Sequence, residues 1–307
     1  MINIYVNKLI DNLPNTINNN NKPIKLDLVL DGGVFNGSYL LGALYFLKEM
    51  EKRNYIIIER ISGCSIGSLA AFIYYIDNLE IMDKLYEIFF NNFKKDYKLN
   101  KIMNLHNYLN NYIPENICEI INNKLYITFY NIKKNKKIVK NRYKNKKDII
   151  DTIIKSCFVP YLINGDKLYK NKYIDGINPY IFEITDDIDK KILYLDLFGY
   201  DKINNLINVK NEKTNYHRIL SGLLDIHNFF IKNTSTTMCS YINDWNIINR
   251  CHLNIKLIFE KCVIYIISLS IYINKYTGNN FNNTIFYKII KKIIYDLYII
   301  LLESYCL

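Results

Sequence analysis

Apolar and polar residues along the first 80 positions form one pattern twice. The apolar run Leu26–Leu30 (LDLVL) stops at Asp31-Gly32-Gly33, which predicts a short buried strand ended by a tight turn. After Gly37, leucines at 40, 41, 44 and 47 follow helical spacing as far as Met50. The β-branched run Tyr55–Ile61 then ends at another glycine, and helical spacing resumes from Ser68 to about Asp77. Two strand–turn–helix units predict an α/β fold with a mainly parallel sheet.

The middle of the chain continues this mixture. Residues 80–122 have a helical pattern, and Leu125–Ile132 with Lys137–Tyr143 predicts a hairpin. A helix is expected from Asp148 to Ser156, and a strand from Lys191 to Phe198.

Both ends differ from the middle. A polar tract at Asn18–Asn21 predicts a linker, and the pattern beyond about residue 205 is helical. The clearest apolar helix face runs from Ile285 to Leu302, with Lys288, Lys291, Lys292 and Asp296 opposite. We therefore expect an N-terminal extension (residues 1–25), a catalytic domain (26–205) and a helical C-terminal extension (206–307).

Composition narrows the function classes. Half of the 307 residues are hydrophobic, so most of the chain can fold around a core. The seven cysteines form no CxxC pair, and there are only four histidines, so neither a zinc site nor another metal or cofactor is expected. Scattered cysteines in odd number favour reduced thiols in an intracellular protein.

The net charge of +11 raises the question of an anionic partner. Nine Lys or Arg residues lie between Lys133 and Lys147. They could meet anionic lipid headgroups, or they could be a solvated hairpin. No nucleic-acid partner is expected, because no aromatic platform or reading helix accompanies them.

No segment has the pattern of a secretory signal or a membrane span. The longest apolar candidate, Cys262–Ile273, is too short to cross a bilayer and is flanked by Lys261 and Lys275. We expect an intracellular protein, cytoplasmic or peripherally attached to a membrane.

The candidate nucleophile is Ser65. Gly63-Cys64-Ser65-Ile66-Gly67 is a GxSxG pentapeptide between a predicted strand and a predicted helix. In that context the serine lies on a sharp turn above the sheet, and small glycines let the backbone bend. The helix N-terminus adds positive potential where negative charge develops.

Two glycine turns could complete a site around this serine. The first is Asp31-Gly32-Gly33-Val34-Phe35-Asn36-Gly37, whose glycines leave backbone N–H groups free to bind an oxyanion. Dinucleotide binding is a poor alternative, because Val34 stands where the GxGxxG fingerprint has its middle glycine. Asp175-Gly176 follows a predicted strand end and supplies a carboxylate that can accept the serine proton directly.

The order DGG(x)xxG, GxSxG, Ser-x-x-x-Pro and Asp-Gly resembles the patatin-like phospholipase family. The resemblance covers roughly residues 26 to 205, including Ser156–Pro160 (SCFVP) and the hairpin. It implies a three-layer α/β/α fold with a mainly parallel central sheet, and a Ser-Asp dyad without histidine. Ser65 would be the nucleophile, Asp175 the base, and Gly32, Gly33 and Val34 the oxyanion loop. The implied substrate is a phospholipid or other lipid ester, with peripheral membrane contact and no metal.

Three residues depart from the family pattern. Val34 stands where a third glycine is usual, Asn36 where Arg or Lys is usual, and Ile177 where Gly or Ala is usual. Loss of one oxyanion donor costs about a hundredfold in rate, so a weakened scaffold that binds membranes or a partner is one alternative. The other is an α/β-hydrolase esterase, whose triad would take its histidine from His217, His227 or His252.

Overall fold

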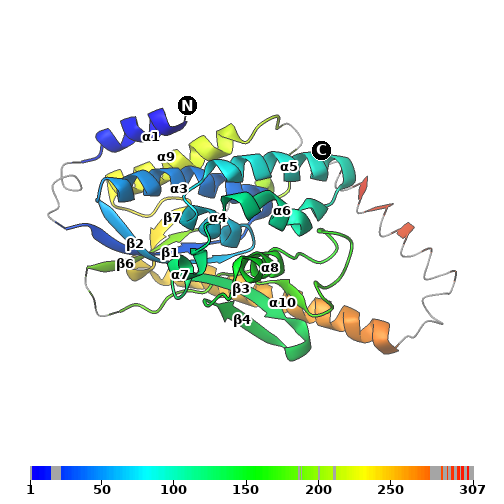
Figure 1. Cartoon of the computed structure of the whole chain (residues 1–307). Coiled ribbons are helices and arrows are strands. Elements are labelled where there is room, and N and C mark those ends of the chain that lie inside the picture. Colours follow the sequence, from blue (N-terminus) through cyan, green and yellow to red (C-terminus); the bar gives the residue numbers. More distant parts are fainter. Residues whose placement is uncertain are drawn as a thin grey trace.

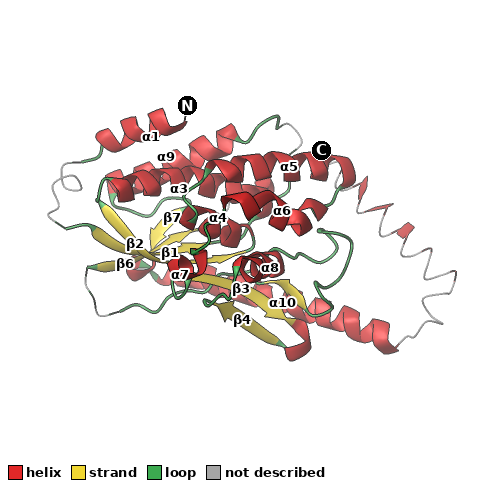
Figure 2. Cartoon of the chain, in the orientation of Figure 1, coloured by secondary structure: helices red, strands yellow, loops and turns green. Residues whose placement is uncertain are grey.

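A central sheet of seven strands organises the molecule (Figures 1 and 2). The computed structural model describes residues 2–14, 22–185, 187, 189–199, 201–209 and 212–276, together with separate residues between 285 and 303. The strands are β1 (Ile24–Leu30), β2 (Ile56–Cys64), β3 (Leu125–Asn131), β4 (Lys136–Lys140), β5 (Tyr173–Asp175), β6 (Lys190–Leu195) and β7 (Cys239–Tyr241).

Parallel pairing dominates the centre of the sheet. The strand order is β4-β3-β2-β1-β6-β7, and β1, β2, β3 and β6 are parallel, while β5 pairs with β3. The antiparallel strands β4 and β7 close the two edges. The predicted α/β fold with a mainly parallel sheet is confirmed.

The helices fall on two sides of this sheet. They are α1 (Ile2–Asp11), α3 (Gly37–Lys52), α4 (Ile66–Tyr75), α5 (Glu80–Asp96), α6 (Leu105–Leu109), α7 (Ile117–Ile121), α8 (Lys146–Ser156), α9 (Tyr216–Lys232) and α10 (Ile247–Tyr276). Figure 1 shows α1, α3, α5 and α9 stacked over one side, whereas α10 crosses the other side.

Alternation along β1 explains the difference between the two sides. Leu26, Leu28 and Leu30 join the large core under α3, α4 and α9, because successive side chains of a strand point to opposite faces. Asp27 and Asp31 point to the opposite face, where Val29 packs in a small cluster. We call these sides the helical face and the α10 face.

The closest packing on the helical face is between α3 and α9. A methyl group on Gly42 would lie 1.9 Å from the carbonyl oxygen of Ile219, and one on Gly222 would lie 2.0 Å from that of Tyr39. Only glycine fits at such distances, so the two helix backbones touch directly.

The structure differs from the sequence-based expectations in three places. Residues of the expected N-terminal extension form α1, whose Val6 and Ile10 are buried in the core. Of residues 80–122, only α5 is a long helix. Beyond residue 205, where helices were expected, β7 adds an edge strand to the sheet. The helix expected from Ile285 to Leu302 lies mostly outside the described residues.

Candidate active site

Ser65 lies at the junction of β2 and α4 in a conformation that few residues adopt. Its φ is 49° and its ψ is −130°, which costs about 1–3 kcal/mol and is characteristic of functional turns. Ser156, the last residue of α8, holds this turn. Its hydroxyl accepts the Ser65 N–H at 2.9 Å and donates to the carbonyl of Thr128 at 2.7 Å.

Strand β3 brings Asp175 to Ser65. The register of β2 on β3 ends at Cys64 opposite Thr128, and the register of β5 on β3 starts with Asp175 opposite Phe129. Because β4 occupies the other edge of β3, β2 and β5 meet end to end along one edge. A methyl group on Gly176 would lie 2.5 Å from the carbonyl oxygen of Thr128, so glycine is required after the aspartate.

The Asp175 carboxyl is buried and has a raised pKa. Burial raises its pKa to about 6, against the lowering effect of hydrogen bonds from the Ser65 side chain and the Ile177 N–H. The Ile177 N–H donates to Oδ1 at 2.8 Å. Nearby Asp31 and Glu260 raise the pKa further. Such a carboxylate is ionised at neutral pH and accepts a proton more readily than an exposed aspartate.

The glycine loop after β1 lies directly against Ser65. A methyl group on Gly32 would be 3.1 Å from the Cβ of Ser65. The Gly32 N–H donates to its neighbour Asp31 Oδ1 at 2.9 Å. Among the described residues, the N–H groups of Gly33 and Val34 have no acceptor. These two groups are therefore the free donors of the loop.

A buried arginine anchors this loop from α9. The Arg218 guanidinium is fully buried and donates to Asn36 Oδ1 at 2.9 Å. Asn36 in turn donates to the carbonyls of Leu197 and Lys202, and Arg218 pairs with Glu212 at 2.6 Å. A basic side chain thus acts beside position 36, although it belongs to a helix 182 residues further along the chain.

A second charged cluster supports the loop from the α10 face. Lys256 Nζ lies 2.7 Å from Asp31 Oδ2 and 2.7 Å from Asp196 Oδ1. Burial alone would lower the pKa of Lys256, but the two carboxylates raise it above its usual value. Lys256 therefore stays charged and fixes Asp31, the residue that enters the glycine loop.

An apolar cavity opens beside Ser65 on the helical face. It encloses about 700 Å³, counting its open mouth. Its wall is almost entirely hydrocarbon and includes Val34, Ile66, Leu69, Met82, Phe89 and Leu105. Such a wall favours apolar groups beside Ser65.

The histidine-dependent alternative is not assembled. All four histidines are among the described residues, and none lines the cavity. His217 lies 3.3 Å from Glu212, His252 lies 3.3 Å from Asp196, and His227 packs against the ring of Phe46. Within the described part of the chain, no cluster of His, Cys, Asp and Glu is placed to hold a metal ion.

Two comparisons with known proteins found a match for this chain. Residues 28–177 match the family model of patatin-like phospholipases. The resemblance inferred from the motifs is thereby confirmed over this patatin-like segment. Among solved structures, the crystal structure of VipD from Legionella pneumophila is similar, with 14% identity and a TM-score of 0.32. The alignment covers 55% of this chain and 49% of that chain, about half of its length. No curated protein sequence matches.

The supports of the candidate site come from residues that the sequence pattern did not indicate. Ser156 was noted only within its Ser-x-x-x-Pro block, and Arg218 and Lys256 carried no motif. A single arginine in an amphipathic helix gives no signal that it will be fully buried. The signal in the sequence was Asn36, which stands where the family usually has Arg or Lys. A basic side chain from another part of the chain could take the place of that residue.

Proposed function

We propose that the protein is a lipid acyl hydrolase of the phospholipase A or lysophospholipase type, acting through a Ser65–Asp175 dyad. The observation that carries the proposal is that Cys64, next to Ser65, and the buried Asp175 pair with the adjacent residues Thr128 and Phe129 of β3, with Ser65 at the wall of an apolar cavity. The patatin-like segment supports a lipid ester as substrate.

The reaction proceeds by acyl transfer in two steps. Asp175 takes the proton of Ser65 as Oγ attacks the ester carbonyl carbon. The N–H groups of Gly33 and Val34 stabilise the oxyanion, while Gly32 holds the loop onto Asp31. Collapse of the intermediate expels the alcohol, which receives the proton from Asp175. Water then attacks the acyl-enzyme, again with Asp175 as base, and releases the fatty acid.

The proposed substrate is a phospholipid or another lipid ester, met by peripheral contact with a membrane. No helix in the described part of the chain is long and apolar enough to cross one. The positive charge of the chain favours anionic lipid.

Hydrolysis of a soluble ester and of phospholipid by the full chain tests the proposal. Ser65→Ala and Asp175→Asn should each lose about a thousandfold or more in kcat/KM, with folding checked by circular dichroism. His227→Gln is the matched control, because this buried ring lies away from Ser65, and it should retain activity. A folded wild-type protein that cleaves no ester would refute the hydrolase and favour a binding scaffold.

A further inference from the structure

Helix α10 presents an apolar face that points away from the molecule. Its inner side is marked by the buried residues Lys256, Glu260 and Ile264. The opposite side carries seven apolar residues that are 58% to 75% exposed and follow helical spacing. These residues define the outer face of α10: Ile248, Ile255, Ile258, Phe259, Tyr265, Ile266 and Leu269.

This face is too extended to be a scatter of single exposed residues. Ile248 and Leu269 are 21 positions apart, which corresponds to roughly 32 Å of helix. Contiguous apolar surface of such length marks an interaction site. Because one exposed helix carries all seven residues, the outer face is a ridge rather than a groove, and it suits a surface that can deform around it.

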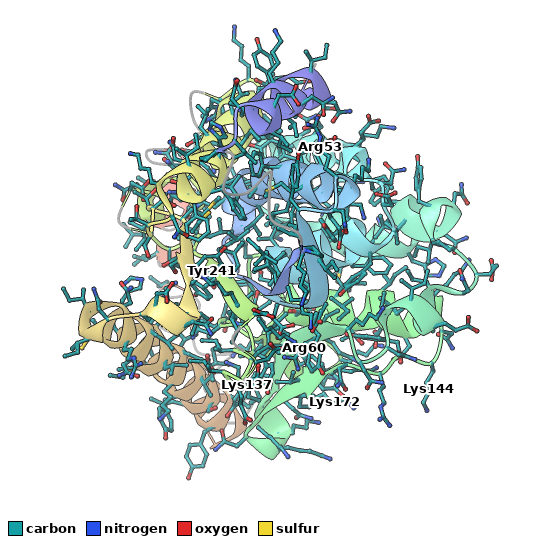
Figure 3. The ribbon with its side chains drawn as sticks, turned by 90° about the vertical axis from the view of Figure 1, so that its left-hand side faces the viewer. Arg53, Arg60, Lys137, Lys144, Lys172 and Tyr241 are labelled. Atoms are coloured by element: carbon teal, nitrogen blue, oxygen red, sulfur yellow. The ribbon has the colours of Figure 1, made fainter. Side chains whose placement is uncertain are left out.

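Basic side chains border the ridge. Arg250 and Lys261 flank it on α10 itself, whereas the single acidic residue of α10, Glu260, is buried and pairs with Lys137 at 2.8 Å. Figure 3 shows Lys137 where the β3–β4 hairpin meets α10. Ile132 in the hairpin turn packs with Ile264 and Ile267 in one cluster. The exposed Lys133, Lys134 and Lys136 therefore lie alongside the helix.

We propose that the outer face of α10 docks on an anionic lipid surface. An apolar helix face bordered by Lys and Arg binds in the plane of a membrane interface, with its apolar side chains among the acyl chains and its cations at the headgroups. The choice of a lipid surface over a protein partner rests on the proposed function, because the substrate of the hydrolase lies in such a surface.

The inner side of the same helix is tied to both loops of the active site. Lys256 binds Asp31, which precedes the glycine loop. Glu260 accepts a hydrogen bond at 2.7 Å from Asn178, three residues after Asp175. One side of α10 would therefore rest on the lipid. The other side holds Asp31 and Asn178, which position the proposed oxyanion donors and the proposed base.

Vesicle binding by full-length Ser65→Ala protein tests the docking surface without hydrolysis of the lipid. The vesicles are phosphatidylcholine with or without phosphatidylserine, and bound protein is measured by co-sedimentation. The Ser65→Ala protein should bind the anionic vesicles. Adding Ile258→Gln, Phe259→Gln and Ile266→Gln should weaken binding roughly tenfold or more. The matched control adds Leu220→Gln, Leu224→Gln and Ile231→Gln, which are 39% to 49% exposed on α9, and it should bind unchanged.

A second variant tests the charges. Lys133→Gln, Lys134→Gln and Lys136→Gln together should weaken binding to anionic vesicles by roughly fivefold per lysine at low salt, and by less at high salt. Thermal unfolding confirms that each variant is folded.

Three results would overturn the docking surface. The first is equal vesicle binding by the α10 and α9 variants, and the second is equal binding to neutral and anionic vesicles. The third is a dimer in sedimentation that is lost only in the α10 variant. The last would identify a second copy of the chain as the occupant. Any of them would leave hydrolysis of a soluble ester by the wild type untouched, so failure of the docking surface is separable from failure of the proposed function.

Discussion

The helical face and the α10 face of the sheet are stabilised by different interactions. On the helical face, β1 buries Leu26, Leu28 and Leu30 in a continuous apolar core. On the α10 face the same strand buries Asp27, which binds Arg60 and Lys190. The residue that follows the strand, Asp31, is also buried and binds Lys256. Strand β1 therefore has hydrophobic packing on one face and buried ion pairs on the other.

The two kinds of interaction differ in what they contribute: one stabilises the fold, and the other positions individual side chains. Apolar burial is strong and non-directional, so it stabilises the fold without fixing any single atom. A buried ion pair adds little net stability, but its removal from one side is costly and its geometry is directional. The active-site loops lie where both meet: the apolar face shapes the cavity, and the charged face holds Asp31 and Asn178 in place.

The largest expected effect comes from breaking the charged face at its centre. Lys256→Met leaves the buried Asp31 and the partly buried Asp196 without their cation, which should cost about 3–5 kcal/mol in the free energy of unfolding. Denaturant titration of the wild type and the variant measures this change in the free energy of unfolding. Adding Asp31→Asn to Lys256→Met should restore part of the lost stability, because only one of the two carboxylates that Lys256 neutralised then remains. Equal stability of the single and double variants would show that the pair is not coupled.

The protonation of Asp175 sharpens the comparison, because Asp31 and Glu260 of the charged face help to raise its pKa from 3.8 to about 6. A raised folded-state pKa means that the folded protein holds the proton more tightly. The folded state is therefore destabilised as pH rises through the window from 3.8 to about 6. Asp175→Asn removes this penalty.

At about pH 8 the inactive Asp175→Asn protein should be more stable than wild type by up to about 3 kcal/mol, and near pH 3 by almost nothing. Unfolding free energies at the two pH values measure this. The wild-type kcat/KM should fall about tenfold per pH unit below about pH 6, because the base is then protonated. A stability difference independent of pH would contradict the buried carboxylate.

The helical face is most sensitive where α3 and α9 touch. Gly222→Ala places a methyl group 2.0 Å from the Tyr39 carbonyl oxygen. The helices must separate, at a cost of about 2 kcal/mol, and the shift of α9 also moves Arg218 away from Asn36. Thermal unfolding measures the first effect and kcat/KM the second. Gly165→Ala is the control, since only the end of Lys98 is near its added methyl group. Its φ of 87° adds local backbone strain, so Gly165→Ala should lose some stability but keep its kcat/KM.

The smallest effect is expected at Val34. This β-branched residue has a φ of 43°, in the left-handed region that glycine tolerates best. Val34→Gly should stabilise the protein by about 1 kcal/mol at most, because relief of strain is partly offset by the entropy of the unfolded chain. Its N–H is unchanged, so activity on a soluble ester should not fall. Destabilisation would show that packing of the valine outweighs its strain.

Local patterns predicted the elements that carry the motifs. The runs before Asp31 and Ser62 are β1 and β2, the basic hairpin is β3–β4, and the helix before Pro160 is α8. Each depends on periodicity and glycine turns within about 20 residues. The proposed dyad itself followed from motif order, because sequence spacing cannot show that Thr128 and Phe129 align Ser65 with Asp175.

Long-range supports could not be predicted in the same way. Arg218 and Asn36 are 182 residues apart, and Lys256 and Asp31 are 225 apart. Their burial depends on how α9 and α10 pack, not on their neighbours in the chain. Segment 2–11 was not predicted as a helix, although its apolar residues follow helical spacing. Val6 and Ile10 are buried in the core, and α1 packs onto α3.

The position of β6 has a consequence for synthesis on the ribosome. β6 is the only described strand that pairs with β1 opposite β2, and it comes after every residue of the proposed dyad and glycine loop. A nascent chain that has exposed residues up to 177 therefore contains the residues of the proposed dyad but has an open sheet edge at β1. It gains Arg218 and then Lys256 only as α9 and α10 emerge. We expect the proposed activity to appear only after both helices have left the exit tunnel, because Arg218 and Lys256 hold the glycine loop.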